Sequence, residues 1–176
     1  MKNIKSERIF NIMNVVSWIV FVGYCIKAGA ICIVSIISLF GNRKATENLY
    51  MGHDLSKLFE FSITHYTIVV VLLILIASLK AYLFYLLINI FKRMDFNKPF
   101  HSAVVNLIFK ISYVAIAIGI IGAIAKSYFT WLVFEVFFTQ IDLGTSAYVF
   151  MAGVIFIVAT LFKRATEIQQ ENELTI

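Results

Sequence analysis

Four long apolar stretches restrict the folds open to this chain more than any other feature of its sequence. They begin near residues 10, 61, 99 and 146, and each is long enough for a helix that crosses a bilayer, which needs roughly 17–25 mostly apolar residues. Hydrophobic residues make up 61% of the chain and charged residues only 14%, whereas soluble domains are about 25% charged. We therefore predict an all-α, four-helix transmembrane bundle in a single domain, residues 1–176, with helices at 10–40, 61–91, 99–126 and 146–172.

The first two predicted helices are longer than the bilayer is thick. At about 1.5 Å per residue each measures about 45 Å, against a hydrocarbon core of about 30 Å, so we expect them to tilt or to project beyond it. The basic N-terminal segment superficially resembles the start of a signal peptide, but the apolar stretch that follows is too long and lacks a small-residue cleavage site. We interpret it as a retained first helix.

The distribution of basic residues predicts the orientation of the bundle. With both termini inside, lysine and arginine are more numerous in the inner flanks, including the turn at 92–98, than in the outer segments at 41–60 and 127–145. This is the pattern of the positive-inside rule. The inner residues are Lys2, Lys5, Arg8, Lys92, Arg93, Lys98, Lys163 and Arg164, and the outer ones are Arg43, Lys44, Lys57 and Lys126. We therefore predict a multi-pass protein with N-in, C-in topology.

The outer segment at 127–145 is rich in aromatic residues that suit the membrane interface, such as Tyr128 and Trp131. We predict that it forms an amphipathic helix over the outer mouth of the bundle. Its sequence "DLGT" is expected to turn the chain before the fourth helix. The other outer segment, at 41–60, is expected to contain a short helix.

The third predicted helix combines a clear start with a face of small residues. Asn97 can cap it, and Pro99 suits its first turn, where a missing N–H has no consequence. Small side chains at spacings of three and four let helix backbones approach closely in lipid. They are Ser112, Ala115, Gly119, Gly122 and Ala123.

Two lysines lie deep within apolar stretches, Lys27 in the first and Lys80 in the second. An unpaired charge at the bilayer centre costs about 2.5 kcal/mol or more, so such residues usually face the bundle interior, a wet cavity or an acidic partner. On a helical wheel Lys27 shares one face with four polar residues, which predicts that this face points inward. They are Ser17, Tyr24, Ser35 and Ser38.

Two interpretations of these lysines remain open. In the first, an outward-open, water-filled pocket attracts an anionic ligand or a lipid headgroup, because the apolar cores of the four helices contain no acidic residue. We assign to this pocket Lys27, Lys80, Tyr24, Ser35 and Glu135. In the second, each lysine extends along a tilted helix toward the interface, or pairs with Glu135 and adjacent polar groups.

The sequence contains no recognisable catalytic or metal-binding motif, so we predict no enzyme activity, no cofactor and no metal. Cys25 and Cys32 are about 10 Å apart along one helix, which is too far for a disulfide. The basic residues form no continuous stripe, which argues against direct binding of nucleic acid. A loose acid–histidine set has no spacing that fixes a metal geometry; it comprises His53, Asp54, Glu60 and His65.

The C-terminal sequence "LFKRATEIQQENELTI" and the turn "NKPFHSAVVNLIFKIS" resemble a bacterial membrane family, the domain of unknown function 2975. The residues after Phe100 depart from the polar continuation of that family. The resemblance implies a four-helix protein of the bacterial inner membrane whose genes neighbour small helix-turn-helix regulators. The matching residues in the C-terminal sequence are Phe162, Lys163, Arg164, Glu167, Gln169, Glu171, Asn172, Leu174 and Thr175.

These observations lead to one leading functional hypothesis and two alternatives. The leading hypothesis is a non-enzymatic sensor or accessory protein that links the outward-facing pocket to a cytoplasmic transcriptional regulator. We expect that partner to bind at Lys163, Arg164, Glu167 and Glu171, although the same residues suit a solvated helix end. The alternatives are a small transporter or channel-like protein for an anionic or lipidic substrate, to which a homodimer would supply more helices, and a structural subunit of a membrane complex.

Overall fold

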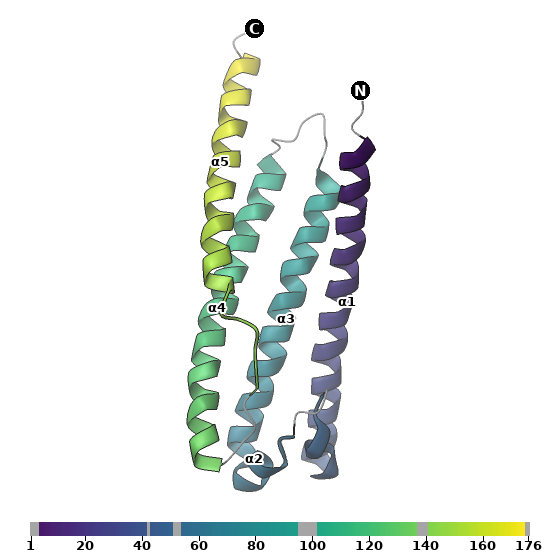
Figure 1. Cartoon of the computed structure of the whole chain (residues 1–176), viewed down its shortest axis with the longest axis vertical. Coiled ribbons are helices and arrows are strands. Elements are labelled where there is room, and N and C mark those ends of the chain that lie inside the picture. Colours follow the sequence, from purple (N-terminus) through teal and green to yellow (C-terminus); the bar gives the residue numbers. More distant parts are fainter. Residues whose placement is uncertain (1–3, 42, 51–53, 95–101, 137–140, 175–176) are drawn as a thin grey trace.

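The computed structural model describes residues 4–41, 43–50, 54–94, 102–136 and 141–174. These residues form helices joined by short connections, with no strand in the described ranges (Figure 1). The elements are α1 (Ile4–Phe40), the 3₁₀-helix η1 (Arg43–Asn48), α2 (Ser56–Phe61), α3 (Ile63–Arg93), α4 (Ser102–Val136) and α5 (Tyr148–Leu174). The predicted all-α architecture is confirmed.

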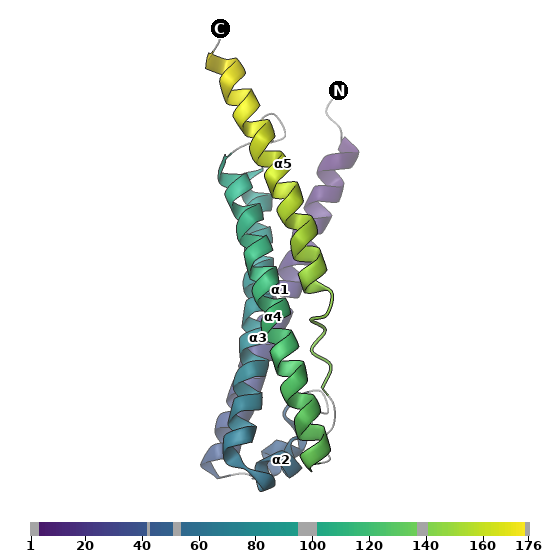
Figure 2. The ribbon, with the colours of Figure 1, turned by 90° about the vertical axis from the view of Figure 1, so that its left-hand side faces the viewer.

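The four long helices pack in the order in which they occur along the chain. α1 packs against α3, α3 against α4, and α4 against α5, whereas the described backbones of α1 and α5 do not come into contact. All four are long and apolar enough to cross a membrane, which confirms the predicted four-helix bundle. Both chain ends lie at the same end of the bundle (Figure 1), and α1 and α5 diverge toward it (Figure 2). We call this the terminal end and the opposite one the loop end; the N-in, C-in orientation stays a prediction.

The core at the loop end is built where η1 and α2 fold against the long helices. Leu55 and Leu58 are fully buried there, beside Tyr66 of α3 and Phe129 of α4. The hydroxyls of Tyr66 and Ser38 lie 2.6 Å apart, which ties α1 to α3. The short helix expected within 41–60 is therefore present, while His53 lies outside the described residues.

α4 continues past the end predicted for the third helix, at residue 126, to Val136. Ala125, Phe129 and Leu132 are each buried, and their spacing of three and four residues keeps them on one helical face. Packing of that face against the loop-end core extends the helix lengthwise, so residues 127–136 do not lie across the mouth of the bundle as we expected. The predicted caps of the third helix, Asn97 and Pro99, lie outside the described residues.

The polar face predicted on α1 is buried against the bundle. Ser17, Ser35 and Ser38 are 3%, 4% and 2% exposed. The Ser17 and Ser35 hydroxyls donate to carbonyls one turn earlier in the same helix, so burial leaves them bonded. The opposite side of α1 exposes apolar side chains suited to lipid, together with the free cysteines Cys25 and Cys32.

The environment of Asn14 on α1 leads to a testable prediction about stability. Its Oδ1 atom is buried and has no hydrogen-bond partner, the one such side-chain atom in the described part of the chain. Because an unsatisfied buried acceptor costs about 1–3 kcal/mol, we expect Asn14→Leu to raise the midpoint of thermal unfolding, followed by circular dichroism in detergent. Asn11→Leu, on the exposed side of the same helix, is the matched control. An equal rise in both variants would refute the explanation.

Candidate functional site

α5 begins part-way along the bundle rather than at its loop end (Figures 1 and 2). Val149, at its start, lies against Gly119 near the middle of α4. The apolar part of α5, from Tyr148 to Phe162, rises only about 22 Å at about 1.5 Å per residue, less than the hydrocarbon core of about 30 Å. The described stretch 141–147 therefore runs beside the other helices without helical hydrogen bonds of its own, and its peptide groups need other partners.

Lys80 supplies a partner to two of these peptide groups. Its Nζ atom donates to the carbonyl of Leu143 at 2.7 Å and to the carbonyl of Gly144 at 3.1 Å. Lys80 is only 7% exposed, so its ammonium is largely shielded by protein, while Leu143 is half-buried and Gly144 is exposed. The two bonds fasten the segment 141–145, which we call the pre-α5 segment, to the middle of α3.

The pre-α5 segment has a conformation that its sequence favours. Gly144 has a φ of +53°, a left-handed conformation that glycine adopts without a steric penalty. Its N–H donates to Oδ1 of Asp142 at 2.9 Å, a short-range turn typical of aspartate. The turn predicted from "DLGT" is therefore present, and it points the carbonyls of Leu143 and Gly144 toward Lys80.

Aromatic rings complete the surroundings of the Lys80 ammonium. Nζ lies 5.7 Å from the centre of the Tyr24 ring and 5.3 Å from that of Tyr148. Both distances allow cation–π attraction, which strengthens when the cation is desolvated. Lys80 therefore joins three elements, α1 through Tyr24, the pre-α5 segment through its carbonyls, and α5 through Tyr148.

The structure brings together three of the five residues that we assigned to the pocket. Lys27, Lys80 and Tyr24 line one cavity of about 20 Å³, which has room for about one water molecule. Lys27 also lies 5.8 Å from the ring centre of Tyr50. Ser35 and Glu135 are not among the residues described as lining this cavity: Ser35 donates to the Ile31 carbonyl of its own helix, and Glu135 is exposed near the end of α4.

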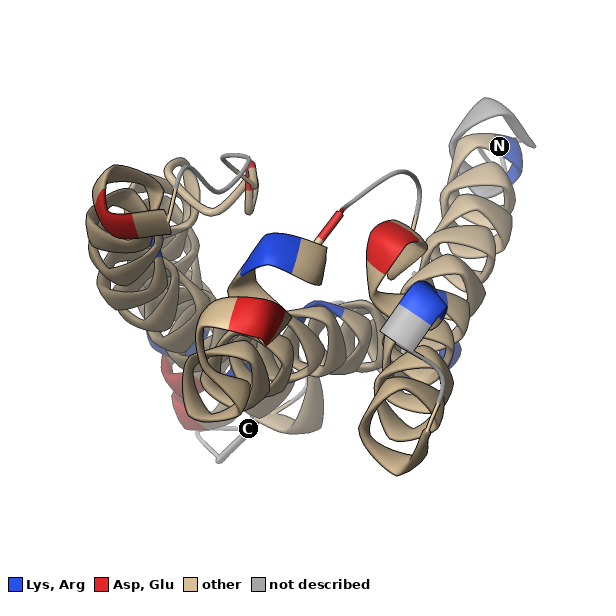
Figure 3. Cartoon of the chain, turned by 90° about the horizontal axis from the view of Figure 1, so that it is seen from below, with Lys and Arg blue, Asp and Glu red and all other residues tan. Residues whose placement is uncertain are grey.

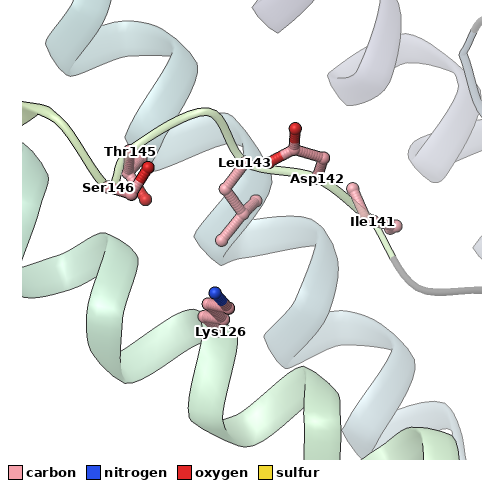
Figure 4. A pocket seen from close by; sticks show the side chains of 6 residues that line it. All are labelled: Lys126, Ile141, Asp142, Leu143, Thr145 and Ser146. Carbon is pink, nitrogen blue, oxygen red and sulfur yellow. The ribbon is translucent and has the colours of Figure 1, made fainter.

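A larger cavity, of about 320 Å³, is lined by the pre-α5 segment and by α4 (Figure 4). Its lining residues are Lys126, Ile141, Asp142, Leu143, Thr145 and Ser146. The side chain of Lys126 extends from α4 toward the segment (Figure 4). Our sequence analysis did not identify this cavity, because it depends on how the segment folds back against α4. Ile141, Asp142 and Leu143 line both cavities, so the two cavities adjoin the same part of the segment.

The predicted partner-binding residues lie on the terminal part of α5. Lys163, Arg164, Glu167 and Glu171 are all exposed, and Lys163 Nζ lies 3.9 Å from a carboxylate oxygen of Glu167. A cavity of about 200 Å³ separates this part of α5 from the start of α4. It is lined by Ser102, Val105, Asn106, Lys163, Thr166, Glu167 and Gln170.

Charged residues are scarce along the helices and present on the loop-end elements. Seen from the loop end, acidic and basic residues appear on the short elements, while the long helices are mostly uncharged (Figure 3). Asp54, beside α2, accepts hydrogen bonds from the backbone N–H and the hydroxyl of Ser56. These bonds hold the pKa of its carboxyl below the usual value. Within the described residues, no group of three His, Cys, Asp or Glu side chains could hold a metal ion.

A comparison of the sequence with protein families gives a match over most of the chain. Residues 53–176 match the model described as "Protein of unknown function (DUF2975)". The chain belongs to this family. The matched DUF2975 region contains Lys80, the pre-α5 segment and the exposed residues of α5, whereas Lys27 and Tyr24 precede it. No curated protein and no solved structure matches the chain.

Proposed function

We propose that this DUF2975 protein is a non-enzymatic membrane sensor or accessory protein. A polar site at the start of α5 would be coupled to a cytoplasmic partner, such as a helix-turn-helix regulator, at the other end of α5. The observation that carries the proposal is the fastening of the pre-α5 segment by Lys80, since α5 follows this segment and continues unbroken from Tyr148 to Leu174.

The hydrogen bonds of Lys80 suggest how a ligand would act on α5. An anionic ligand or lipid headgroup that reached Lys80 would compete with the carbonyls of Leu143 and Gly144 for the same ammonium protons. The adjoining cavity of about 20 Å³ is too small for such a group, so the pre-α5 segment would have to move before the group could enter. A ligand with different affinity for the two positions of the segment shifts the equilibrium between them, and α5 would carry the change to its exposed end.

The proposal predicts that loss of the Lys80 ammonium moves the terminal end of α5. Spin labels at Asn106→Cys on α4 and Gln170→Cys on α5 flank the cavity at that end; Cys25 and Cys32 are first replaced by serine. We expect Lys80→Met to shift or broaden the distribution of distances between the two labels, measured by double electron–electron resonance in lipid nanodiscs. Lys110→Met, an exposed lysine of α4, should leave it unchanged. An unaltered distribution in a folded Lys80→Met protein would overturn the coupling.

One observation favours a second function, a small transporter for an anionic or lipidic substrate. Non-helical backbone beside a broken or shortened helix is a feature of transporter binding sites, and the pre-α5 segment has this form. A transporter would move its substrate in proteoliposomes that contain no other protein. A sensor would move none, and its response would need the partner at α5.

A further inference from the structure

Lys126 and Asp142 line the same cavity without forming an ion pair. Lys126 belongs to α4 and Asp142 to the pre-α5 segment. The one ion pair within the described ranges joins Lys163 to Glu167, at the other end of the molecule. Asp142 also lines the smaller cavity with Lys27 and Lys80 and interacts electrostatically with Lys80, whereas Lys126 has no ion-pair partner among the described residues.

The lining of this cavity offers further polar groups. An ammonium such as that of Lys126 has three donors, and a carboxylate has room for several acceptor contacts. Asp142 uses one oxygen for the N–H of Gly144, which orients the carboxylate and leaves its second oxygen with no described bond. Thr145 and Ser146 add hydroxyls. The volume of about 320 Å³ falls at the lower end of the range of small-molecule sites, which is about 300–1,000 Å³.

We propose that this cavity binds a zwitterionic group, with a phosphate or carboxylate at Lys126 and a primary ammonium at Asp142. An anion alone would bind Lys126 but offer no donor to the second oxygen of Asp142, and a cation alone would be repelled by Lys126. A zwitterion satisfies both charges. The inference rests on the proposed function, since such a ligand would contact the segment that Lys80 holds and that leads into α5.

The position of Lys126 admits two sources for the zwitterion. Along α4 it lies about 36 Å from Ser102 at about 1.5 Å per residue, which is beyond a hydrocarbon core of about 30 Å if that core begins near Ser102. At this level the site can be reached by the headgroup of phosphatidylethanolamine in the adjoining leaflet. A free solute with the same amine and acid groups can reach it from the aqueous side.

The direct test is a calorimetric titration of the protein in phosphatidylcholine nanodiscs with phosphoethanolamine. Phosphocholine, whose methylated ammonium cannot donate to Asp142, and glycerol phosphate, which has no ammonium, are the comparison ligands. We expect each to bind at least about tenfold more weakly, because each lacks one charge-assisted hydrogen bond to the site. Lys126→Met and Asp142→Asn should weaken phosphoethanolamine binding by a similar factor. The amide oxygen introduced by Asp142→Asn can still accept the N–H of Gly144, and Lys110→Met serves as the control.

The two sources give different results. Binding of free phosphoethanolamine in these nanodiscs supports a soluble ligand. Retention of phosphatidylethanolamine over phosphatidylcholine in native mass spectrometry, lost in both variants, supports a lipid headgroup. If neither occurs, or if glycerol phosphate binds equally well and Asp142→Asn has no effect, the zwitterion site is refuted. Ligand binding with an unchanged distance between the labels at 106 and 170 would leave this site standing and overturn the proposed coupling instead.

Discussion

Replacement of Lys80 by methionine is expected to lower the free energy of unfolding by about 1–3 kcal/mol. Methionine keeps most of the apolar stem of lysine and removes the ammonium. The carbonyls of Leu143 and Gly144 then lose a donor at 2.7 Å and 3.1 Å. A buried polar group left without a partner costs about 1–3 kcal/mol, and water is scarce in the apolar part of a membrane.

The loss can be measured by denaturant titration in mixed micelles, with helical content followed by circular dichroism. Lys80→Arg separates the charge from the packing, because arginine still donates hydrogen bonds and should lose much less stability. Lys110→Met repeats the substitution at an exposed site on α4. If Lys80→Met and Lys110→Met unfold at the same denaturant concentration, the two carbonyl bonds do not stabilise the fold.

The same variant should loosen one part of the molecule more than the rest. The pre-α5 segment depends on Lys80, whereas the packing of α1 on α3 involves residues along the length of both helices. We therefore expect Lys80→Met to speed amide hydrogen exchange, relative to the wild type, more at Gly144, Thr145 and Tyr148 than in the rest of the chain. Such local opening is what the proposed coupling between the polar site and α5 requires.

Local patterns were sufficient to predict the helices and the buried face of α1. A helix that crosses a membrane is specified by its own apolar residues, so all four could be located from the sequence. The burial of Ser17, Ser35 and Ser38 follows from their shared face on a helix with 3.6 residues per turn. The small residues of α4 could be predicted to permit close packing, and Ser112 does donate to the Ala152 carbonyl of α5 at 2.9 Å.

The partners of Lys80 could not be predicted in the same way. We looked for acidic side chains near the two lysines and considered Glu135, but the hydrogen bonds of Lys80 go to backbone carbonyls 63 and 64 residues later in the chain. Every residue has a carbonyl, so the sequence marks none as the acceptor. The cavity at Lys126 is hidden for a related reason, since it forms only where the pre-α5 segment returns along α4.

Gly122 provides the second large effect, because Thr145 of the pre-α5 segment occupies the space that any side chain there would need. An ideal Cβ atom at position 122 would overlap both Oγ1 and Cβ of Thr145, closer than the 3.0 Å that real Cβ atoms keep from their neighbours. A rotation of the threonine side chain cannot remove the second overlap, since Cβ is fixed to the backbone. The segment must therefore move away from α4 to admit even a methyl group. We expect Gly122→Ala to destabilise the protein by about 1–3 kcal/mol, the usual effect of overpacking.

Gly153→Ala is the matched control, because a Cβ atom there meets nothing within 4 Å. Alanine has the better helix propensity by about 1 kcal/mol, so this variant should be neutral or slightly more stable.

A second substitution can relieve the clash at position 122 and so test its cause. Thr145→Gly removes the Cβ atom that would meet the new methyl group, and Gly122→Ala should then cost less in the Thr145→Gly background than in the wild type. The difference, measured as a double-mutant cycle by denaturant titration, reports the coupling between the two positions. Equal losses of stability in both backgrounds would mean that Gly122→Ala acts on α4 itself and not through a clash with Thr145. A smaller loss in the Thr145→Gly background would instead show that Thr145 packs directly on Gly122, next to the two carbonyls that Lys80 binds.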